Sequence, residues 1–373
     1  MTPPLAANTH STVPRPPAIA FEGPAPNLEP APRRVLVKEV NWLGDLVMSL
    51  PALRSIRKAW PQAHLAVLVK KELAGFFAGC DWLNEVIPYS IRKGWRGFGD
   101  QRQLVAELKK REFDLSICFP NSFRSALWPA WAGVPKRAGF ARDWRGPLLT
   151  HRVRPHKDIL ECHQVHYYQY MLRKSVGVNG APEDCALTAH EPLRAKMKLW
   201  LQERRERPEG KLIALAVAAA YGPAKEWPPA RYAALIDLLA EKYDAECVLV
   251  GAPSERIKCE QVAAESKVGA MLAAGETQVG EAIAMLSLCD AFAGNDSGSM
   301  HVAGALGIPT VGIFGSTRAD RTGPLGPKTR ILYKKLECSP CLERTCRFGH
   351  YDCLKQIEPS HVLAALNELG VFA

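Results

Sequence analysis

The chain lacks any long apolar run. Its longest run, near residues 212–221, is rich in alanine and shorter than the roughly 18 residues that a membrane-spanning helix needs. The N-terminus also lacks the compact apolar core of a secretory signal peptide. We therefore expect a cytoplasmic protein. Its composition, 47% hydrophobic and 23% charged, is ordinary for a soluble globular chain.

Two arrangements that would indicate a metal-dependent or disulfide-bonded protein are also missing. No Asp-x-Asp pair occurs, so the usual carboxylate ligands of a catalytic divalent cation have no visible source. The 11 cysteines are odd in number and scattered along a long chain, which fits reduced thiols better than a disulfide framework.

Acidic residues are scarce in one stretch of a chain whose formal net charge is +10. Arg92 to Arg154 holds fourteen Lys and Arg against five Asp and Glu. Such a stretch attracts nucleic acid, an anionic membrane surface or a phosphorylated substrate, or it is simply a solvated surface. Because no recognisable nucleic-acid module or continuous basic helix accompanies it, we expect no nucleic-acid partner.

A length of 373 residues favours two domains. Residues 1–33 are proline-rich without apolar periodicity, which predicts a disordered tail. Beyond them, strands alternate with amphipathic helices, which predicts doubly wound parallel sheets. We expect domains at 34–185 and 186–373, the second ending in a closing helix at 359–369.

The stretch 290–317 reads as strand, tight turn, helix, strand and turn. Asn295 to Gly298 supplies turn and N-cap residues, so a helix begins there with free N–H groups and a positive dipole end. Such a terminus suits a phosphate, and His301 adds either a donor or a cation. Ser316 and Thr317 end the next strand beside it. An ordinary capped helix is the alternative.

Polar residues also follow two predicted strands of the first half, where ligands of open α/β sheets collect. A lone carboxylate there and an anion-binding set with Lys225 in the second half together describe a nucleotide-sugar transferase. Its carboxylate, Asp45, takes the acceptor proton while Lys225 and helix dipoles stabilise the departing diphosphate. The acceptor-side candidates beside Asp45 are Asn41, Gly44, Asn121, Ser122 and Arg124.

Five stretches together carry a family resemblance that covers the chain from Val35 onward. They are NWLGDLVMSLPAL, EFDLSICFPNSFRSAL, YGPAKEWP, NDSGSMHVAGALGIPTVGIFGST and CSPCLERTCRFGHYDCL. In this order they resemble the ADP-heptose:lipopolysaccharide heptosyltransferases of glycosyltransferase family 9, most closely the heptosyltransferase II branch.

The resemblance implies a GT-B fold, in which two Rossmann-like domains face each other across the active-site cleft. It implies inversion at the anomeric carbon of the heptose without a metal or other cofactor, and Asp45 matches the proposed general base. Lys225 matches the diphosphate contact. The donor-binding matches are Asp296 facing sugar hydroxyls, Ser297, Gly298 and His301 at the phosphates, Ser316 and Thr317 beside them, and Glu255 and Thr277 at ribose and adenine.

The implied donor is ADP-L-glycero-D-manno-heptose, and the implied acceptor is the inner-core heptose of lipopolysaccharide (heptosyl-Kdo-lipid A). Such an enzyme works at the anionic inner leaflet of the inner membrane as a peripheral protein. Two rival hypotheses remain open. One is a related transferase with another sugar or acceptor, and the other is a catalytically weak nucleotide-binding homologue.

Three features leave questions. The family usually carries Pro-Gly-Ala-Glu where this chain has Val217 to Ala220, so a glycine and an acid are missing near the donor site. Cysteines 338, 341, 346 and 353, with His350 nearby, fit either a zinc site or a loop of reduced thiols. His156, His163 and His166 are expected to be solvated or packed side chains rather than metal ligands.

Overall fold

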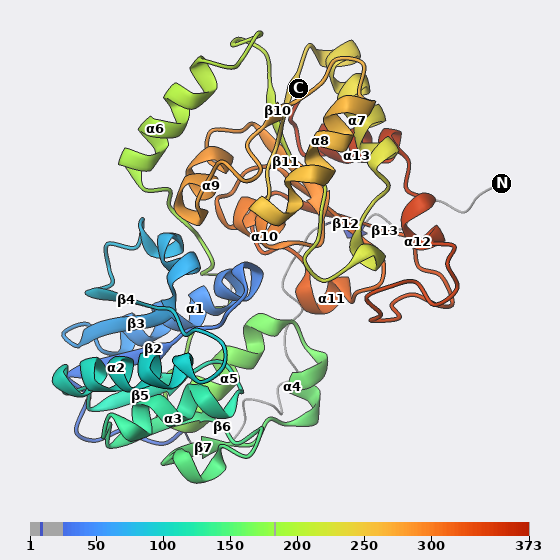
Figure 1. Cartoon of the computed structure of the whole chain (residues 1–373). Coiled ribbons are helices and arrows are strands. Elements are labelled where there is room, and N and C mark those ends of the chain that lie inside the picture. The colour runs from blue at the N-terminus through green and yellow to red at the C-terminus, as the bar shows by residue number, and fades with distance from the viewer. Residues whose placement is uncertain (1–7, 10–24, 183, 373) are drawn as a thin grey trace. The chain divides into compact units, whose positions relative to one another are not determined.

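The computed structural model describes residues 8–9, 25–182 and 184–372. The chain divides between Cys185 and Ala186 into an N-terminal and a C-terminal unit, and Asn8–Thr9 belongs with the C-terminal unit (Figure 1). Most of the predicted disordered tail lies outside the described residues. Of its described part, Leu28 is buried and Asn8–Thr9 forms a short strand.

The N-terminal unit is built on a six-stranded sheet in the order β4-β3-β2-β5-β6-β7, with every neighbouring pair parallel. Aliphatic runs such as the one in β3 form its centre because both faces are covered by helices. The strand order is that of a doubly wound Rossmann sheet, which reverses direction between β2 and β5. The strands are β2 (Arg34–Lys38), β3 (His64–Lys70), β4 (Glu85–Tyr89), β5 (Leu115–Cys118), β6 (Lys136–Phe140) and β7 (His151–Val153).

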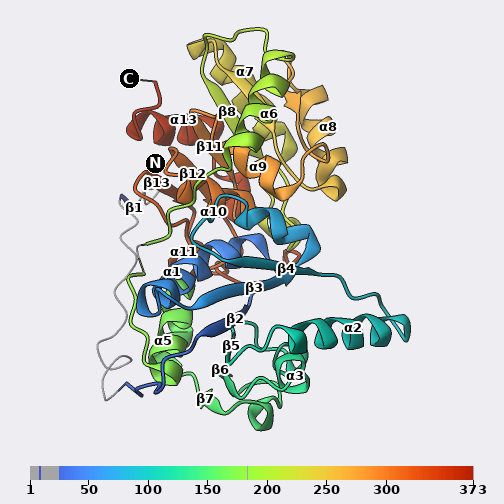
Figure 2. The ribbon, with the colours of Figure 1, turned by 90° about the vertical axis from the view of Figure 1, so that its left-hand side faces the viewer.

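Helices of this unit pack in two groups (Figure 2): α1 packs against α5, and α2 against α3. Leu104 and Leu108 of α2 and Trp128 of α3 bury a core with Leu36 and Leu68 of the sheet. The helices are α1 (Leu43–Ala59), α2 (Arg96–Lys110), α3 (Phe123–Trp131), α4 (Lys157–Glu161) and α5 (Gln164–Val176), with 3₁₀ turns η2 (Lys71–Phe77) and η3 (Gly146–Leu148).

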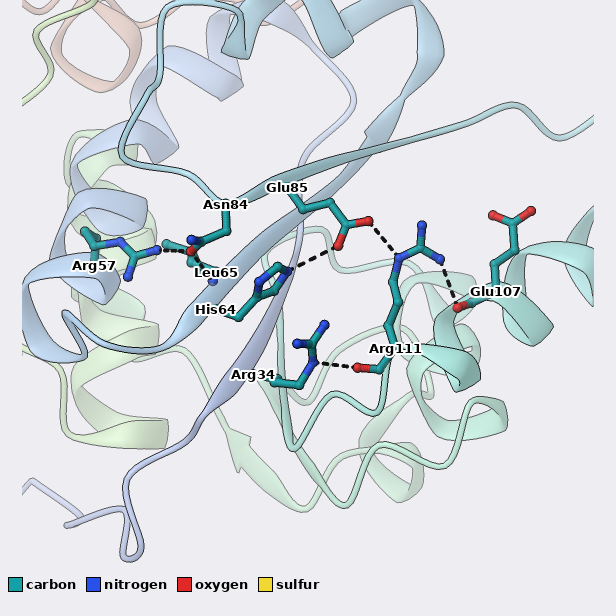
Figure 3. A network of polar contacts seen from close by, with 8 residues as sticks. All are labelled: Arg34, Arg57, His64, Leu65, Asn84, Glu85, Glu107 and Arg111. Atoms are coloured by element: carbon teal, nitrogen blue, oxygen red, sulfur yellow. Dashed lines mark hydrogen bonds and ion pairs between the residues drawn. The ribbon is translucent and has the colours of Figure 1, made fainter.

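A polar network ties the amino-terminal ends of β3 and β4 to the end of α2 (Figure 3). The Glu85 carboxylate accepts a hydrogen bond from Arg111 Nε at 2.8 Å and lies 3.3 Å from His64 Nε2. Arg34 Nε donates to the carbonyl oxygen of Arg111 at 2.7 Å. Arg111 therefore serves the fold, although it belongs to the basic stretch of the sequence.

The C-terminal unit repeats the same strand order, β10-β9-β8-β11-β12-β13, and β1 adds antiparallel at the edge beside β13. The predicted doubly wound parallel sheets are thus confirmed in both units. The strands are β1 (Asn8–Thr9), β8 (Leu212–Ala216), β9 (Glu246–Leu249), β10 (Met271–Leu272), β11 (Ala291–Asn295), β12 (Thr310–Phe314) and β13 (Thr329–Tyr333).

Helices α7, α8 and α13 enclose a hydrophobic core of this unit, where Trp227 and Tyr232 are fully buried with aliphatic residues of β8, β9 and β11. α10 packs against β11 and β12. The helices are α6 (Glu191–Gln202), α7 (Pro229–Tyr243), α8 (Arg256–Glu265), α9 (Val279–Leu286), α10 (Gly298–Ala305), α11 (Ala319–Thr322), α12 (Asp352–Lys355) and α13 (Pro359–Glu368), with 3₁₀ turns η4 (Pro223–Lys225) and η5 (Pro253–Glu255).

Among the described residues, no helix combines the length and the apolar character that crossing a membrane requires. The three histidines near α4 and α5 have structural roles. His156 and His163 cap α4 and α5, because their side chains accept the N–H groups of Asp158 and Val165. His166 is buried within α5.

Candidate active site

The C-terminal sheet reverses its strand order between β8 and β11, and ligands of such sheets bind beyond the carboxyl ends of the strands at this point. The loop after β8 carries Lys225, and the turn after β11 carries Asp296 and Ser297 before α10 begins. Ser316 and Thr317 follow the neighbouring strand β12. Sequence-predicted donor residues from three separate segments thus meet at one rim.

Asn295 fixes the geometry of this rim, and sequence reasoning missed it. Its side chain is fully buried, and its Oδ1 accepts hydrogen bonds from the Trp227 N–H and the Tyr232 hydroxyl, both at 2.9 Å. Its Nδ2 donates to the carbonyl oxygen of Val217 at 3.0 Å. One amide therefore joins the end of β11 to both ends of the Lys225 loop.

The centre of the site is an ion pair. Lys225 Nζ lies 2.6 Å from Asp296 Oδ2, and the two side chains are only 14% and 4% exposed. The Thr317 hydroxyl donates to the same oxygen at 2.6 Å. This pairing holds the lysine over the turn and satisfies a carboxylate that would be costly to bury alone.

Three polar atoms around this pair are buried and have no hydrogen-bond partner in the part of the chain that the structure describes: Ser297 Oγ, His301 Nδ1 and Ser316 Oγ. Buried polar groups are almost always paired, and an unpaired one costs about 1–3 kcal/mol. The N-terminal turn of α10 adds backbone N–H groups that its own helix does not use. Together these groups form a ready site for an oxyanion.

Burial governs the charge of His301. Burial, opposed by the Asp296 charge and aided by the Lys225 charge, lowers the pKa of the imidazole from 6.5 to about 4. The ring is therefore neutral near pH 7. The sequence predicted that His301 is either a hydrogen-bond donor or a cation. A neutral imidazole can act as the donor but not as the cation.

Residues 338–353, the cysteine-rich segment, contact both the Lys225 loop and the turn after β12. The Ala224 N–H donates to the Arg344 carbonyl oxygen at 3.0 Å, and the Leu342 N–H donates to the Ser316 carbonyl oxygen at 2.7 Å. Gly222, at φ +144°, allows this approach, because a Cβ atom there would lie 2.6 Å from the Arg344 oxygen. The segment thus holds the two loops in register.

The Tyr221 ring contacts two cations, Lys225 and Arg344, beside the Lys225–Asp296 ion pair. Lys225 Nζ lies 4.9 Å from the centre of its ring, and Arg344 Cζ lies 5.1 Å from the same point. Among the described residues no carboxylate pairs with Arg344. Sequence reasoning missed Tyr221 and Arg344, although the Tyr-Gly-Pro-Ala-Lys run offered a signal for the tyrosine.

The four cysteines of this segment are free thiols that line a cavity of about 20 Å³ together with His350. Cys338 Sγ lies 4.0 Å from His350 Nε2. N–H groups of Tyr351 and its neighbours lower the pKa of the Cys346 thiol. In the described part of the chain, no group of three or more His, Cys, Asp or Glu side chains could hold a metal ion.

The departure from the family pattern at Val217 to Ala220 is accommodated locally. The Val217 carbonyl oxygen accepts a hydrogen bond from Asn295 Nδ2, and the Ala219 N–H donates to Glu226 Oε1 at 3.2 Å. Glu226 in turn pairs with Lys258. A carboxylate thus lies against this backbone, although it comes from a position later in the sequence.

Glu255 and Thr277 lie on the loops after β9 and β10, along the same rim. The Glu255 carboxylate accepts the Ala252 N–H at 2.7 Å and closes its own turn. The Thr277 hydroxyl donates to the Ala273 carbonyl oxygen at 3.5 Å. Among the described residues, neither side chain contacts the Lys225–Asp296 pair, and what they share with it is the position on this rim.

The N-terminal sheet has an equivalent reversal between β2 and β5. Asp45 stands in the first turn of α1, where the helix dipole favours an acid, and Gly44 precedes it. Asn41 Oδ1 accepts the Tyr89 hydroxyl at 2.9 Å, and Asn121 Nδ2 donates to the Tyr167 hydroxyl at 2.9 Å. Ser122 and Arg124, at the start of α3, are exposed.

Two adjacent buried ionisable residues at the end of β2, Lys38 and Glu39, were not anticipated. Lys38 Nζ donates to the Glu39 carbonyl oxygen, and the Glu39 carboxylate accepts the Ser49 hydroxyl at 3.0 Å. Burial lowers the pKa of Lys38 to about 7 and raises the pKa of Glu39 to about 7, and the attraction between the two charges opposes both shifts. The Asp45 charge further raises the pKa of Glu39, so the two carboxyl groups are electrostatic neighbours. The signal was a charged dipeptide inside the apolar run Val-Leu-Val-Lys-Glu-Val.

With this geometry in hand, comparisons with known proteins give a consistent result. The sequence profile of the family described as "Glycosyltransferase family 9 (heptosyltransferase)" matches residues 101–352. "Lipopolysaccharide heptosyltransferase 2" of Salmonella typhimurium is 29% identical over 348 residues, covering 90% of this chain and 98% of that protein. "Lipooligosaccharide heptosyltransferase 2" of Haemophilus ducreyi is 28% identical over 351 residues, covering 90% and 99%.

Solved structures agree. "E. coli ADP-heptose lps heptosyltransferase II" superposes with a TM-score of 0.77 at 28% identity, covering 90% of this chain and 98% of that chain. A "glycosyl transferase family 9" protein of Veillonella parvula gives a TM-score of 0.81 at 21% identity, covering 92% and 98%, and this likeness concerns the fold alone. The similarity confirms the expected GT-B-like α/β fold.

Proposed function

Because the chain belongs to glycosyltransferase family 9, the heptosyltransferases, we propose that it transfers heptose from ADP-L-glycero-D-manno-heptose to the inner-core heptose of lipopolysaccharide. It is a glycosyltransferase, and its relatives named lipopolysaccharide heptosyltransferase 2 support this donor and acceptor. The observation that carries the proposal is the set of unpaired buried donors around Lys225 and Asp296.

The donor diphosphate binds at the start of α10. Its oxygens accept hydrogen bonds from the hydroxyls of Ser297 and Ser316 and from an N–H of neutral His301. These buried groups thereby gain hydrogen-bond partners. Lys225 turns from Asp296 toward the phosphates, and Asp296, still held by Thr317, becomes free to accept sugar hydroxyls. Adenine and ribose lie toward Glu255 and Thr277.

Transfer proceeds by a single displacement with inversion. Asp45 removes the proton from the acceptor hydroxyl as its oxygen attacks the anomeric carbon of the heptose. The bond from that carbon to the diphosphate oxygen breaks, and ADP leaves with the bonding electrons. Lys225 and the N–H groups of α10 stabilise the charge on the departing phosphate, so the step calls for no cofactor.

The acceptor is embedded in a membrane, so we place the enzyme in the cytoplasm, peripheral to the anionic inner leaflet. Asn41, Gly44, Asn121, Ser122 and Arg124 share the rim with Asp45 and are proposed to contact the acceptor sugars. Arg124 is the exposed cation among them and suits an acceptor phosphate or carboxylate.

The test is to incubate the purified chain with ADP-heptose and heptosyl-Kdo-lipid A, with and without EDTA, and to measure released ADP and the glycosylated product. We expect equal amounts of both, unchanged by EDTA. Product from another ADP-sugar but not from ADP-heptose would support a transferase of different specificity. Tight ADP binding without product from any donor would support the nucleotide-binding homologue.

A further inference from the structure

The carboxyl-terminal rim of the N-terminal sheet carries exposed aromatic side chains on four loops. Trp42 follows β2, Phe123 follows β5, and both are exposed. Trp95 ends the connection from β4 to α2, Phe98 lies in the first turn of α2, and they are 83% and 57% exposed. Trp144, after β6, is 93% exposed. Since the strands are parallel, all four connections leave the sheet at its carboxyl-terminal rim.

This concentration is not general to the molecule. Among the described Trp and Phe side chains, only Trp131 and Phe348 are comparably exposed elsewhere. Large aromatic side chains are normally buried, and a gathering of exposed ones marks an interaction surface. The connection that carries Trp95 extends beyond the edge of the sheet (Figure 2), where it can reach a flat partner.

Exposed cations accompany the aromatic residues on three of these loops. Lys93 and Arg96 flank Trp95, and the Arg96 guanidinium lies 5.6 Å from the Trp95 ring centre. Arg124 follows Phe123, and Arg142 precedes Trp144 by two positions. The rim is therefore both apolar and positively charged.

Three arginines of the basic stretch make contacts within the fold. Arg145 is fully buried and donates to carbonyl oxygens and to Ser125 Oγ at 2.8 Å. Arg137 donates to the Leu148 carbonyl oxygen at 2.6 Å. Arg111 pairs with Glu85, as described above. These three arginines support the fold. Lys109 and Lys110 are exposed at the far end of α2, whereas the cations beside the exposed aromatic residues lie on the rim itself.

We propose that this aromatic–basic rim, formed by Trp95, Phe98 and Trp144 with Lys93, Arg96 and Arg142, docks the enzyme on an anionic lipid bilayer. Indole rings favour the membrane–water interface, and nearby Lys and Arg are attracted to anionic headgroups. The inference rests on the proposed function, because a membrane-embedded acceptor must reach Asp45 on this same rim. Aromatic side chains alone or basic side chains alone attach a protein weakly, whereas the two together hold it at the membrane surface.

Vesicle flotation tests the docking surface. The full chain is mixed with vesicles of phosphatidylcholine, with or without phosphatidylglycerol, at low and high salt. We expect flotation only with the anionic vesicles. The double variant Trp95→Ala/Phe98→Ala is expected to reduce binding about tenfold at both salt concentrations, since burial of apolar area is insensitive to screening.

The charge variant Lys93→Glu/Arg96→Glu is expected to reduce binding about tenfold or more at low salt, with a smaller effect at high salt. Phe348→Ala and Arg347→Glu are the matched controls, because Phe348 is 60% exposed and lies beside an exposed arginine on the C-terminal unit. These controls are expected to float as the wild type does. Equal losses in controls and rim variants, or no loss in either, would overturn the proposal.

Two further measurements separate this inference from the proposed function. ADP affinity and transfer to a detergent-dispersed acceptor are expected to be unchanged in the rim variants, since neither step needs a bilayer. Normal transfer by a wild-type enzyme that fails to bind anionic vesicles would reject the docking surface and leave the function standing. Vesicle binding through this rim by a protein that releases no ADP would reject the function and retain the surface.

Discussion

The Lys225 ammonium group lies 2.6 Å from the Asp296 carboxylate, so two groups proposed to bind the donor neutralise each other before the donor arrives. His301 beside them is uncharged near pH 7 because burial lowers its pKa to about 4. These three residues therefore present no net charge, and in the proposed donor complex Lys225 exchanges the Asp296 carboxylate for the diphosphate.

Replacing Lys225 with alanine is expected to have two separable effects. It leaves the Asp296 carboxylate buried with the Thr317 hydroxyl as its remaining side-chain partner among the described residues, which costs about 3 kcal/mol of folding free energy. It also removes the mobile cation for the diphosphate, so ADP affinity should fall at least about tenfold. Urea unfolding and calorimetric titration with ADP measure the two quantities.

The double variant Lys225→Met/Asp296→Asn is the control for that experiment. It removes both charges, so stability should return toward the wild-type value while ADP affinity remains weak. Recovery of ADP binding in the double variant would show that Lys225 acts through the fold and not through the phosphates.

Ser297 and Ser316 are expected to show a trade between stability and binding. Their hydroxyl oxygens are buried without a hydrogen-bond partner among the described residues, so Ser316→Ala or Ser297→Ala should raise the melting temperature or leave it unchanged. The same variants should bind ADP several-fold more weakly. Thermal melts with and without ADP check both effects, and a large destabilisation without ADP would show that these hydroxyls serve the fold.

His301 predicts a specific pH dependence of stability. Its pKa is lowered from 6.5 to about 4 by folding, so its contribution to stability is complete above pH 6.5. That contribution is lost as the pH falls from 6.5 toward 4, because the unfolded chain takes up a proton that the folded chain refuses. The total difference is about 3 kcal/mol.

Unfolding free energies of the wild type and of His301→Gln are measured from pH 7 to pH 4. The difference between the two curves gives the contribution of His301 to stability. The stability of the wild type should fall more steeply than that of the variant across this interval. Parallel curves would show that the imidazole is accessible to protons in the folded chain.

Arg344 is expected to contact the terminal phosphate of the nucleoside diphosphate. It shares the Tyr221 ring with Lys225, and no described carboxylate pairs with it. Arg344→Ala should weaken ADP binding about tenfold and AMP binding much less. Arg347→Ala, three residues away on the same exposed segment, is the matched control and should change neither. Equal losses for AMP and ADP would place Arg344 away from the terminal phosphate.

Much of the fold could be predicted from periodicity because the central strands are uninterrupted aliphatic runs between amphipathic helices. β6 and β13 were not predicted, since Lys-Arg-Ala-Gly-Phe and Thr-Arg-Ile-Leu-Tyr mix charge or glycine with apolar residues. Their strand character depends on pairing with β5 and β12, which a local pattern cannot reveal.

The loops of the candidate site were predictable because turn residues follow the central strands. The supporting residues were not. Asn295 resembled one more turn residue, and its buried bonds to Trp227 and Tyr232 depend on segments more than sixty positions away. Arg344 reaches the site only through the packing of the cysteine-rich segment on the Lys225 loop. Charge in the basic stretch also gave no indication that Arg145 is buried.

The most direct test of the account is single-turnover transfer by Asp45→Asn, with ADP affinity measured on the same preparation. We predict that transfer falls about 10²- to 10⁴-fold because the general base is lost, while ADP binds as tightly as it does to the wild type. Asp81→Asn, an exposed acid of the same unit, should transfer normally. Wild-type turnover by Asp45→Asn would contradict the assignment of the base and with it the proposed mechanism.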